Sequence, residues 1–77
     1  MQMKIDESFY KEIGKQIFHK RAEKGYSLRQ LGKITGLSRT TLENYEMGKT
    51  RITKSNWESI CNALGINNKI STSITLH

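Results

Sequence analysis

Glycine is the residue that most constrains how this chain can fold. The sequence has 77 residues and no proline, and glycine interrupts it at short intervals. Four glycines each follow a segment whose apolar residues recur at helical spacing: Gly25, Gly36, Gly48 and Gly65. A glycine just past such a segment is typical of a helix end. The pattern predicts several short helices separated by tight glycine turns.

Capping residues predict where these helices begin. Ser27 and Gln30 have the spacing of a capping box, in which each side chain bonds the other residue's backbone amide. Ser38 precedes the next periodic segment, and Thr53 or Ser55 precedes the last one, so each can cap a helix. The expected helices cover about residues 7–24, 28–35, 39–47 and a segment from the Thr53 or Ser55 cap to Leu64.

The two ends of the chain have a different periodicity. Apolar and polar residues alternate over residues 70–76 and again over residues 1–5, which is typical of a strand. A lone strand leaves its backbone groups unpaired, so such segments would pair with each other or with a second chain. Frayed ends are the alternative. We therefore expect a domain over residues 6–66, an N-terminal arm over 1–5 and a C-terminal tail over 67–77, a candidate dimerisation strand.

Composition limits the class of protein. The length allows one domain, and 13 Lys and Arg against 7 Asp and Glu leave a net charge of +6. This excess favours a polyanionic partner, although solubility alone is another explanation for it. One Cys and two His exclude an intrachain disulfide and a closed zinc site. There is no run long enough to span a membrane and no apolar signal segment. We expect a cytoplasmic domain that uses no metal and no other cofactor.

The middle of the chain has the spacing of a helix-turn-helix, two short helices joined by a tight turn. Gly36 suits a turn that needs an unusual backbone angle. Gly32 lies where the two helices would cross, a position that requires a small residue. Any three-helix bundle needs a similar apolar seam, so spacing alone does not identify a function. The seam residues are Leu31, Leu37, Leu42 and Tyr45.

Over residues 14–66 several motifs occur together. They are Ile17-x-x-x-Arg21, GYSLRQLG at 25–32, Gly36-Leu37-Ser38, Leu42-x-x-Tyr45-Glu46-x-Gly48 and Ile60-Cys61-x-Ala63-Leu64-Gly65-Ile66. In combination they resemble the phage-repressor and Cro type of helix-turn-helix proteins, the XRE-like family. The resemblance implies an all-α, lambda-repressor-like bundle of four or five helices. It implies a homodimer that binds a near-palindromic operator in double-stranded DNA and regulates transcription, more often as a repressor. A phage, plasmid or other mobile element is the setting it implies.

The resemblance also implies roles for single residues. Arg21 and Glu46 match a structural ion pair. Residues that match or adjoin the groove-facing positions are expected to contact bases: Arg39, Thr40, Thr41 and Asn44. Residues around them are expected to contact phosphates: Ser27, Arg29, Ser38, Lys49, Thr50, Arg51 and Lys54.

The chemistry of these side chains agrees with the implied roles. The N-terminal part of a recognition helix meets base edges, where Arg39 can bind guanine O6 and N7 as a fork. Asn44 can bind adenine N6 and N7 in the same way. Thr40 and Thr41 can offer a hydroxyl, or a methyl group to a thymine. The cations of the 49–51 loop suit phosphate contacts.

Three features depart from the family pattern. Leu28 replaces the glutamine that often opens the second helix, so that phosphate contact is lost unless Ser27 or Arg29 substitutes. Thr35 stands where an aliphatic residue is commoner, which would weaken the seam. No convincing fifth helix follows Ile66, and many relatives dimerise around that helix. We expect residues 70–76 to pair across a twofold axis instead.

Two other classes of function are open to this sequence. The same fold serves in antitoxins and other modules that bind a partner protein, and the tail would then be the partner segment. An enzyme is disfavoured, because no catalytic grouping has convincing spacing. Gly48-Lys49-Thr50 looks like the end of a nucleotide-binding P-loop, but that loop requires glycine where position 43 is Glu.

Overall fold

The computed structural model describes residues 7–66, which form four helices. These are α1 (Glu7–Lys24), α2 (Leu28–Thr35), α3 (Arg39–Met47) and α4 (Lys54–Leu64). The prediction of an all-α bundle of four or five helices is confirmed, and no strand occurs within residues 7–66. The expected strands, the arm over 1–5 and the tail over 67–77 lie outside the described residues.

Side-chain caps and glycines set the limits of the helices as the sequence predicts. The Ser27 Oγ accepts from the Gln30 amide at 3.0 Å, and the Gln30 Oε1 accepts from the Ser27 amide at 2.8 Å. Thr53 caps α4 by accepting from the Asn56 amide, which settles the choice between Thr53 and Ser55. Gly36 ends α2 with a φ of 81°, a left-handed conformation that a side chain would strain.

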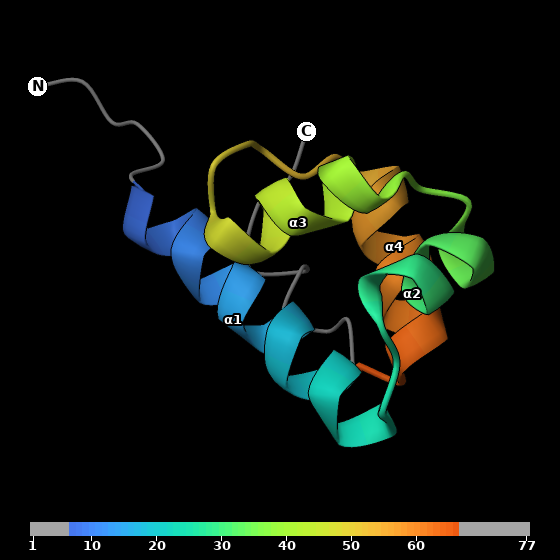
Figure 1. Ribbon diagram of the computed structural model, residues 1–77. Coiled ribbons are helices and arrows are strands. Elements are labelled where there is room, and N and C mark those ends of the chain that lie inside the picture. The colour runs from blue at the N-terminus through green and yellow to red at the C-terminus, as the bar shows by residue number, and fades with distance from the viewer. Residues whose placement is uncertain (1–6, 67–77) are drawn as a thin grey trace, which may run out of the picture.

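Figure 1 shows α3 lying above the first half of α1, with α2 and α4 grouped beside them. Helix α1 packs against both α3 and α4, and α2 packs against the same two helices. Each fully buried apolar side chain contributes roughly 1.5–3 kcal/mol. The largest of these side chains are Trp57, Ile17, Leu31, Leu42, Ile52, Ile60 and Leu64.

Two glycines let backbones approach closely. A Cβ on Gly32 would lie 2.7 Å from the Leu37 carbonyl oxygen, so the predicted need for a small residue there is confirmed. A Cβ on Gly14 would overlap the carbonyl oxygens of Tyr45 and Glu46. Gly14 therefore sets how closely α1 lies against the end of α3.

Thr35, a departure from the family pattern, takes part in the turn after α2. Its hydroxyl donates to the Leu31 carbonyl at 2.8 Å and accepts from the Leu37 amide at 3.2 Å. The two bonds join the last turn of α2 to the turn that leads into α3. An aliphatic residue at this position could not make either bond.

Candidate nucleic-acid interface

Helix α3 exposes one face to solvent. Leu42 and Tyr45 are buried against the core, whereas Arg39 and Thr40 are exposed in the first turn. Asn44, one turn further along from Thr40, is half-buried. The helix therefore presents three of the four predicted base-contacting residues away from the core.

Thr41, the fourth of these residues, lies at the edge of the exposed face. It is half-buried, and its hydroxyl accepts a hydrogen bond from the Ser38 hydroxyl at 2.9 Å. The Ser38 Oγ in turn accepts from the Thr41 amide at 3.0 Å and so caps α3. Both hydroxyls are thus engaged in holding the start of α3.

A shallow hollow lies between α2 and the start of α3. Three cationic side chains line it and no acidic one does. Arg29, Lys33 and Arg39 are all exposed there, and Ser38, the N-cap of α3, also lines the hollow. The structure thus brings together two residues predicted to contact phosphate, Arg29 and Ser38, with one predicted to contact a base. Ser27 is exposed at the start of α2, where it belongs to the capping box.

The loop between α3 and α4 is the second basic segment. Lys49, Thr50 and Arg51 are exposed in it, and Lys54 is exposed in the first turn of α4. Ile52 is fully buried beneath this loop and fixes it to the core. The Lys49 amide donates to the Asn44 carbonyl at 2.9 Å, which fixes the start of the loop to the end of α3.

Sequence reasoning missed two contacts that position this loop. Ile52 stands alone among polar residues, so no periodicity marks it as buried. The Asn56 side-chain amide donates to the Tyr45 hydroxyl at 2.8 Å and joins α4 to α3. Nothing in the sequence signals that bond, because the two residues lie on different helices.

Arg21 and Glu46 form an ion pair that joins α1 to α3. The Arg21 Nε and Nη2 donate to the two Glu46 carboxylate oxygens at 2.6 and 3.0 Å. The Nη1 donates to the Tyr26 carbonyl at 2.8 Å, and the guanidinium lies 5.5 Å from the centre of the Phe18 ring. The hydrogen bond to Glu46 raises the pKa of Arg21, against an opposing effect of burial. Because the Arg21 guanidinium donates all of these bonds within the protein, it stabilises the packing of α1 against α3.

Leu28 lies in a groove where α1, α2 and α3 meet, lined by both apolar and charged side chains. It is half-buried, and the groove is also lined by Phe18 and Met47, which are 47% and 50% exposed. The residue that replaces the usual glutamine is packed against the hydrophobic core.

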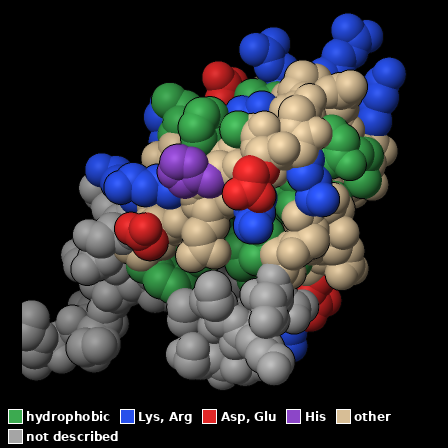
Figure 2. All heavy atoms as spheres, turned by 90° about the horizontal axis from the view of Figure 1, so that it is seen from below, with side chains coloured by type: hydrophobic (Ala, Val, Ile, Leu, Met, Phe, Trp, Pro, Cys, Tyr) green, Lys and Arg blue, Asp and Glu red, His purple; other side chains and the backbone are tan. Residues whose placement is uncertain are grey.

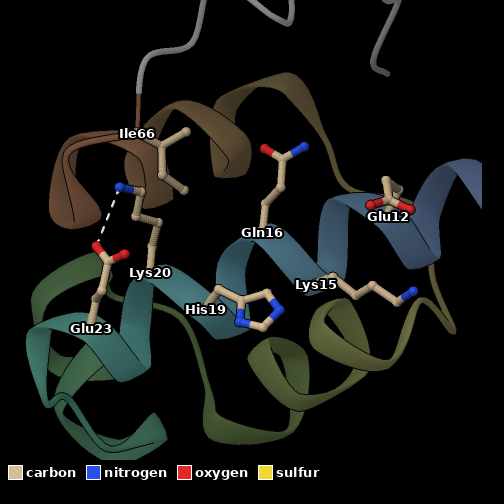
Figure 3. Close-up of a pocket in the computed structure, with 7 residues that line it drawn as sticks. All are labelled: Glu12, Lys15, Gln16, His19, Lys20, Glu23 and Ile66. Atoms are coloured by element: carbon tan, nitrogen blue, oxygen red, sulfur yellow. Dashed lines mark hydrogen bonds and ion pairs between the residues drawn. The ribbon is translucent and has the colours of Figure 1, made fainter.

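A second groove runs along α1 and is shown in Figure 3. It contains the ion pair of Lys20 and Glu23, at 3.3 Å, and reaches Ile66 after α4. None of the predicted site residues lines it. On the face of the molecule in Figure 2, acidic and basic side chains are interspersed. The α3 surface and its basic segments are therefore the better candidate for binding a polyanion.

Other kinds of site find little support within residues 7–66. No group of three His, Cys, Asp or Glu side chains gathers there to hold a metal ion. No helix in this part of the chain is long and apolar enough to cross a membrane. Cys61 is buried, and burial raises the pKa of its thiol to about 11. Its environment therefore disfavours the reactive thiolate.

This arrangement defines a class of protein: a helix-turn-helix whose second helix is exposed between basic segments, the geometry that major-groove readers use. A helix-turn-helix family model matches residues 17–67, more than half of the chain. The chain belongs to the XRE-like, lambda-repressor-like helix-turn-helix family.

Solved structures with a similar fold include a restriction-modification controller protein and a clp gene regulator. The restriction-modification controller protein C.AhdI from Aeromonas hydrophila is 25% identical, with a TM-score of 0.74, over 78% of this chain and 91% of its own. The clp gene regulator ClgR from Corynebacterium glutamicum is similar in two structures. One is 30% identical over 73% of this chain and 60% of its own, with a TM-score of 0.70. The other is 25% identical over 88% and 91%, with a TM-score of 0.75.

No curated protein matches the sequence. The family and these neighbours support a DNA-binding transcriptional regulator. The family and these neighbours are regulatory proteins, which argues against an enzyme.

Proposed function

We propose that this chain is a sequence-specific repressor that binds a near-palindromic operator in double-stranded DNA as a homodimer. One observation carries the proposal: the exposed face of α3 has cations at both of its ends. Arg29 and Lys33 of α2 line a hollow beside the start of α3, and Lys49 and Arg51 follow its end. A helix inserted in the major groove passes between two phosphate strands, so cations are needed on both sides.

The residues divide into base-contacting and phosphate-contacting sets. Arg39 would select guanine, Asn44 would select adenine, and Thr40 would offer its hydroxyl or methyl group. Thr41 lies at the edge of the surface and already accepts a bond from Ser38, so we expect a smaller contribution from it. The phosphate-contacting set is Ser27, Arg29, Ser38, Lys49, Thr50, Arg51 and Lys54.

The proposed dimer matches the twofold symmetry of a palindromic operator. Two copies of α3 would lie about 34 Å apart, so that they enter successive major grooves. An operator occupied in this way blocks the polymerase sterically. Repression of its own operon, on a phage, plasmid or other mobile element, is the regulation that we propose. The proposed pairing segment, residues 70–76, lies outside the described residues.

Selection of bound duplexes from a randomised pool tests the proposal. The wild-type protein should select a palindromic consensus without any partner protein. Failure to select one, together with a tight complex with a co-encoded protein, would favour the antitoxin alternative.

An Arg39→Ala variant then tests base reading. It should lose about 1–3 kcal/mol of binding on that consensus and lose discrimination at one base position. Lys24→Ala makes the same change of charge in the last turn of α1 and should leave the preference intact. An equal loss by Arg39→Ala on all sequences would contradict base reading.

A further inference from the structure

The exposed face of α3 carries an acidic side chain, Glu43, that the proposed function does not use. Glu43 follows Thr40 by three residues and Arg39 by four, so the three side chains share one side of the helix. Successive residues of a helix are rotated by about 100°, so Thr40 and Met47, seven residues apart, are nearly aligned along α3. Glu43 and Asn44 lie on opposite sides of that row. Glu43 is therefore as well placed as Asn44 to meet an object that contacts this face.

No contact with residues 7–66 neutralises the Glu43 charge. Within residues 7–66 its carboxylate forms no ion pair and no hydrogen bond. Lys15 lines the same groove between α1 and α3, yet the two side chains are not paired. Glu46, three residues further along, is by contrast bonded twice to Arg21. The described part of the fold therefore leaves the Glu43 carboxylate without a partner.

A free carboxylate on this face has one favourable partner in DNA. It is repelled by phosphates, and a basic protein gains affinity by neutralising them. In the major groove guanine presents only the acceptors O6 and N7, and adenine places its N7 acceptor beside its N6 donor. Cytosine presents the N4 amino donor, which glutamate accepts.

We propose that Glu43 determines specificity by accepting a hydrogen bond from the N4 amino group of a cytosine in the operator. The inference rests on the proposed DNA-binding function and adds a contact to one further base of the operator. Arg39 and Glu43 then have opposite requirements on one helix face: Arg39 selects an acceptor edge, and Glu43 selects a donor edge. Guanine at the Glu43 position is rejected, because its O6 repels the carboxylate.

The test selects duplexes from one randomised pool with the wild type, Glu43→Ala and Glu43→Gln. The wild-type consensus should contain a cytosine at one position of each half-site where Glu43→Ala has no preference. Glu43→Gln should prefer adenine there, because an amide pairs with N6 and N7. Changing that cytosine pair should weaken the wild type on the order of 5- to 150-fold and leave the Ala variant nearly unaffected.

Two controls separate base reading from charge. Glu12→Gln removes the same charge from an exposed position on α1 and should leave the consensus unchanged. N4-methylcytosine at the selected position blocks the donor, so it should weaken the wild type and not Glu43→Ala. A thermal melt verifies that the substitutions at exposed Glu43 keep the fold.

The inference is overturned if Glu43→Ala selects the wild-type consensus at every position, with affinity raised equally on all duplexes. Glu43 would then be only a repelling charge, and the proposed function would stand. If the wild type itself selects no consensus, both the proposed function and this inference fail.

Discussion

Replacing Glu46 with glutamine removes the charge that holds Arg21 while keeping nearly the same side-chain shape. The pair joins the last turn of α1 to the last turn of α3, and the two side chains are 15% and 10% exposed. In Glu46→Gln the amide NH₂ group faces a guanidinium nitrogen, and donors cannot bond donors. Arg21 then keeps the Tyr26 carbonyl and one amide oxygen.

The expected loss follows from the burial of the pair. Hydrogen bonds to charged groups contribute about 1.5–3 kcal/mol each, and breaking a buried ion pair costs about 3–5 kcal/mol. This pair keeps some contact with solvent, so we expect Glu46→Gln to lower the free energy of unfolding by about 2–4 kcal/mol. For a domain of this size, that corresponds to a fall of roughly 10–25 °C in Tm.

Urea and thermal unfolding followed by circular dichroism measure the effect. Glu43→Gln is the matched control, because Glu43 is exposed and unpaired on the same helix; its change should stay within about 0.5 kcal/mol. The double variant Arg21→Met, Glu46→Leu should regain most of the loss, since no buried charge is left without a partner. A loss below about 1 kcal/mol in Glu46→Gln would refute the conclusion that this pair stabilises the packing of α1 against α3.

Three further changes have defined outcomes. Gly14→Ala should lower the free energy of unfolding by about 3 kcal/mol in urea, since its Cβ would overlap rigid backbone of α3; an unchanged midpoint would contradict this packing. Burial raises the pKa of Cys61 from 9.0 to about 11, so the unfolded thiol ionises first and stability falls by up to about 3 kcal/mol between these pH values. Thermal melts of Cys61→Ala should lack that decline. An equal decline in both proteins would show that Cys61 ionisation is not its cause. Lys49→Ala should weaken binding to all duplexes alike and flatten the salt dependence by about one unit, whereas a base-dependent loss would exclude a phosphate contact.

Most of the fold could be predicted because its signals are local. A capping box at Ser27 and a left-handed glycine at Gly36 each involve residues within a few positions, so spacing in the sequence is enough to place them. Gly32 was predictable for a similar reason, since the turn that it must accommodate follows directly. The helix limits agree with the sequence for this reason.

What could not be predicted depends on residues that are far apart along the chain. Ile52 is buried because the loop after α3 folds back over the core, and a single apolar residue among polar ones has no periodicity. Gly14 is required because α1 meets the carbonyl oxygens at the end of α3. The bond between Asn56 and Tyr45 joins two helices whose relative position no local pattern contains.

The sequence by itself determined that this chain forms short glycine-ended helices with a helix-turn-helix among them, because capping and periodicity act over one or two turns. It also determined which side chains have the chemistry to read bases, Arg39 and Asn44 among them. Only the tertiary structure decided which charged side chains of α3 form an ion pair with another helix. Packing pairs Glu46 with Arg21 of α1, whereas Glu43, on the exposed face of α3, has no partner among residues 7–66. The physical reason is that the exposed face of a helix is defined by what covers its other side, and here α1 and α2 cover it.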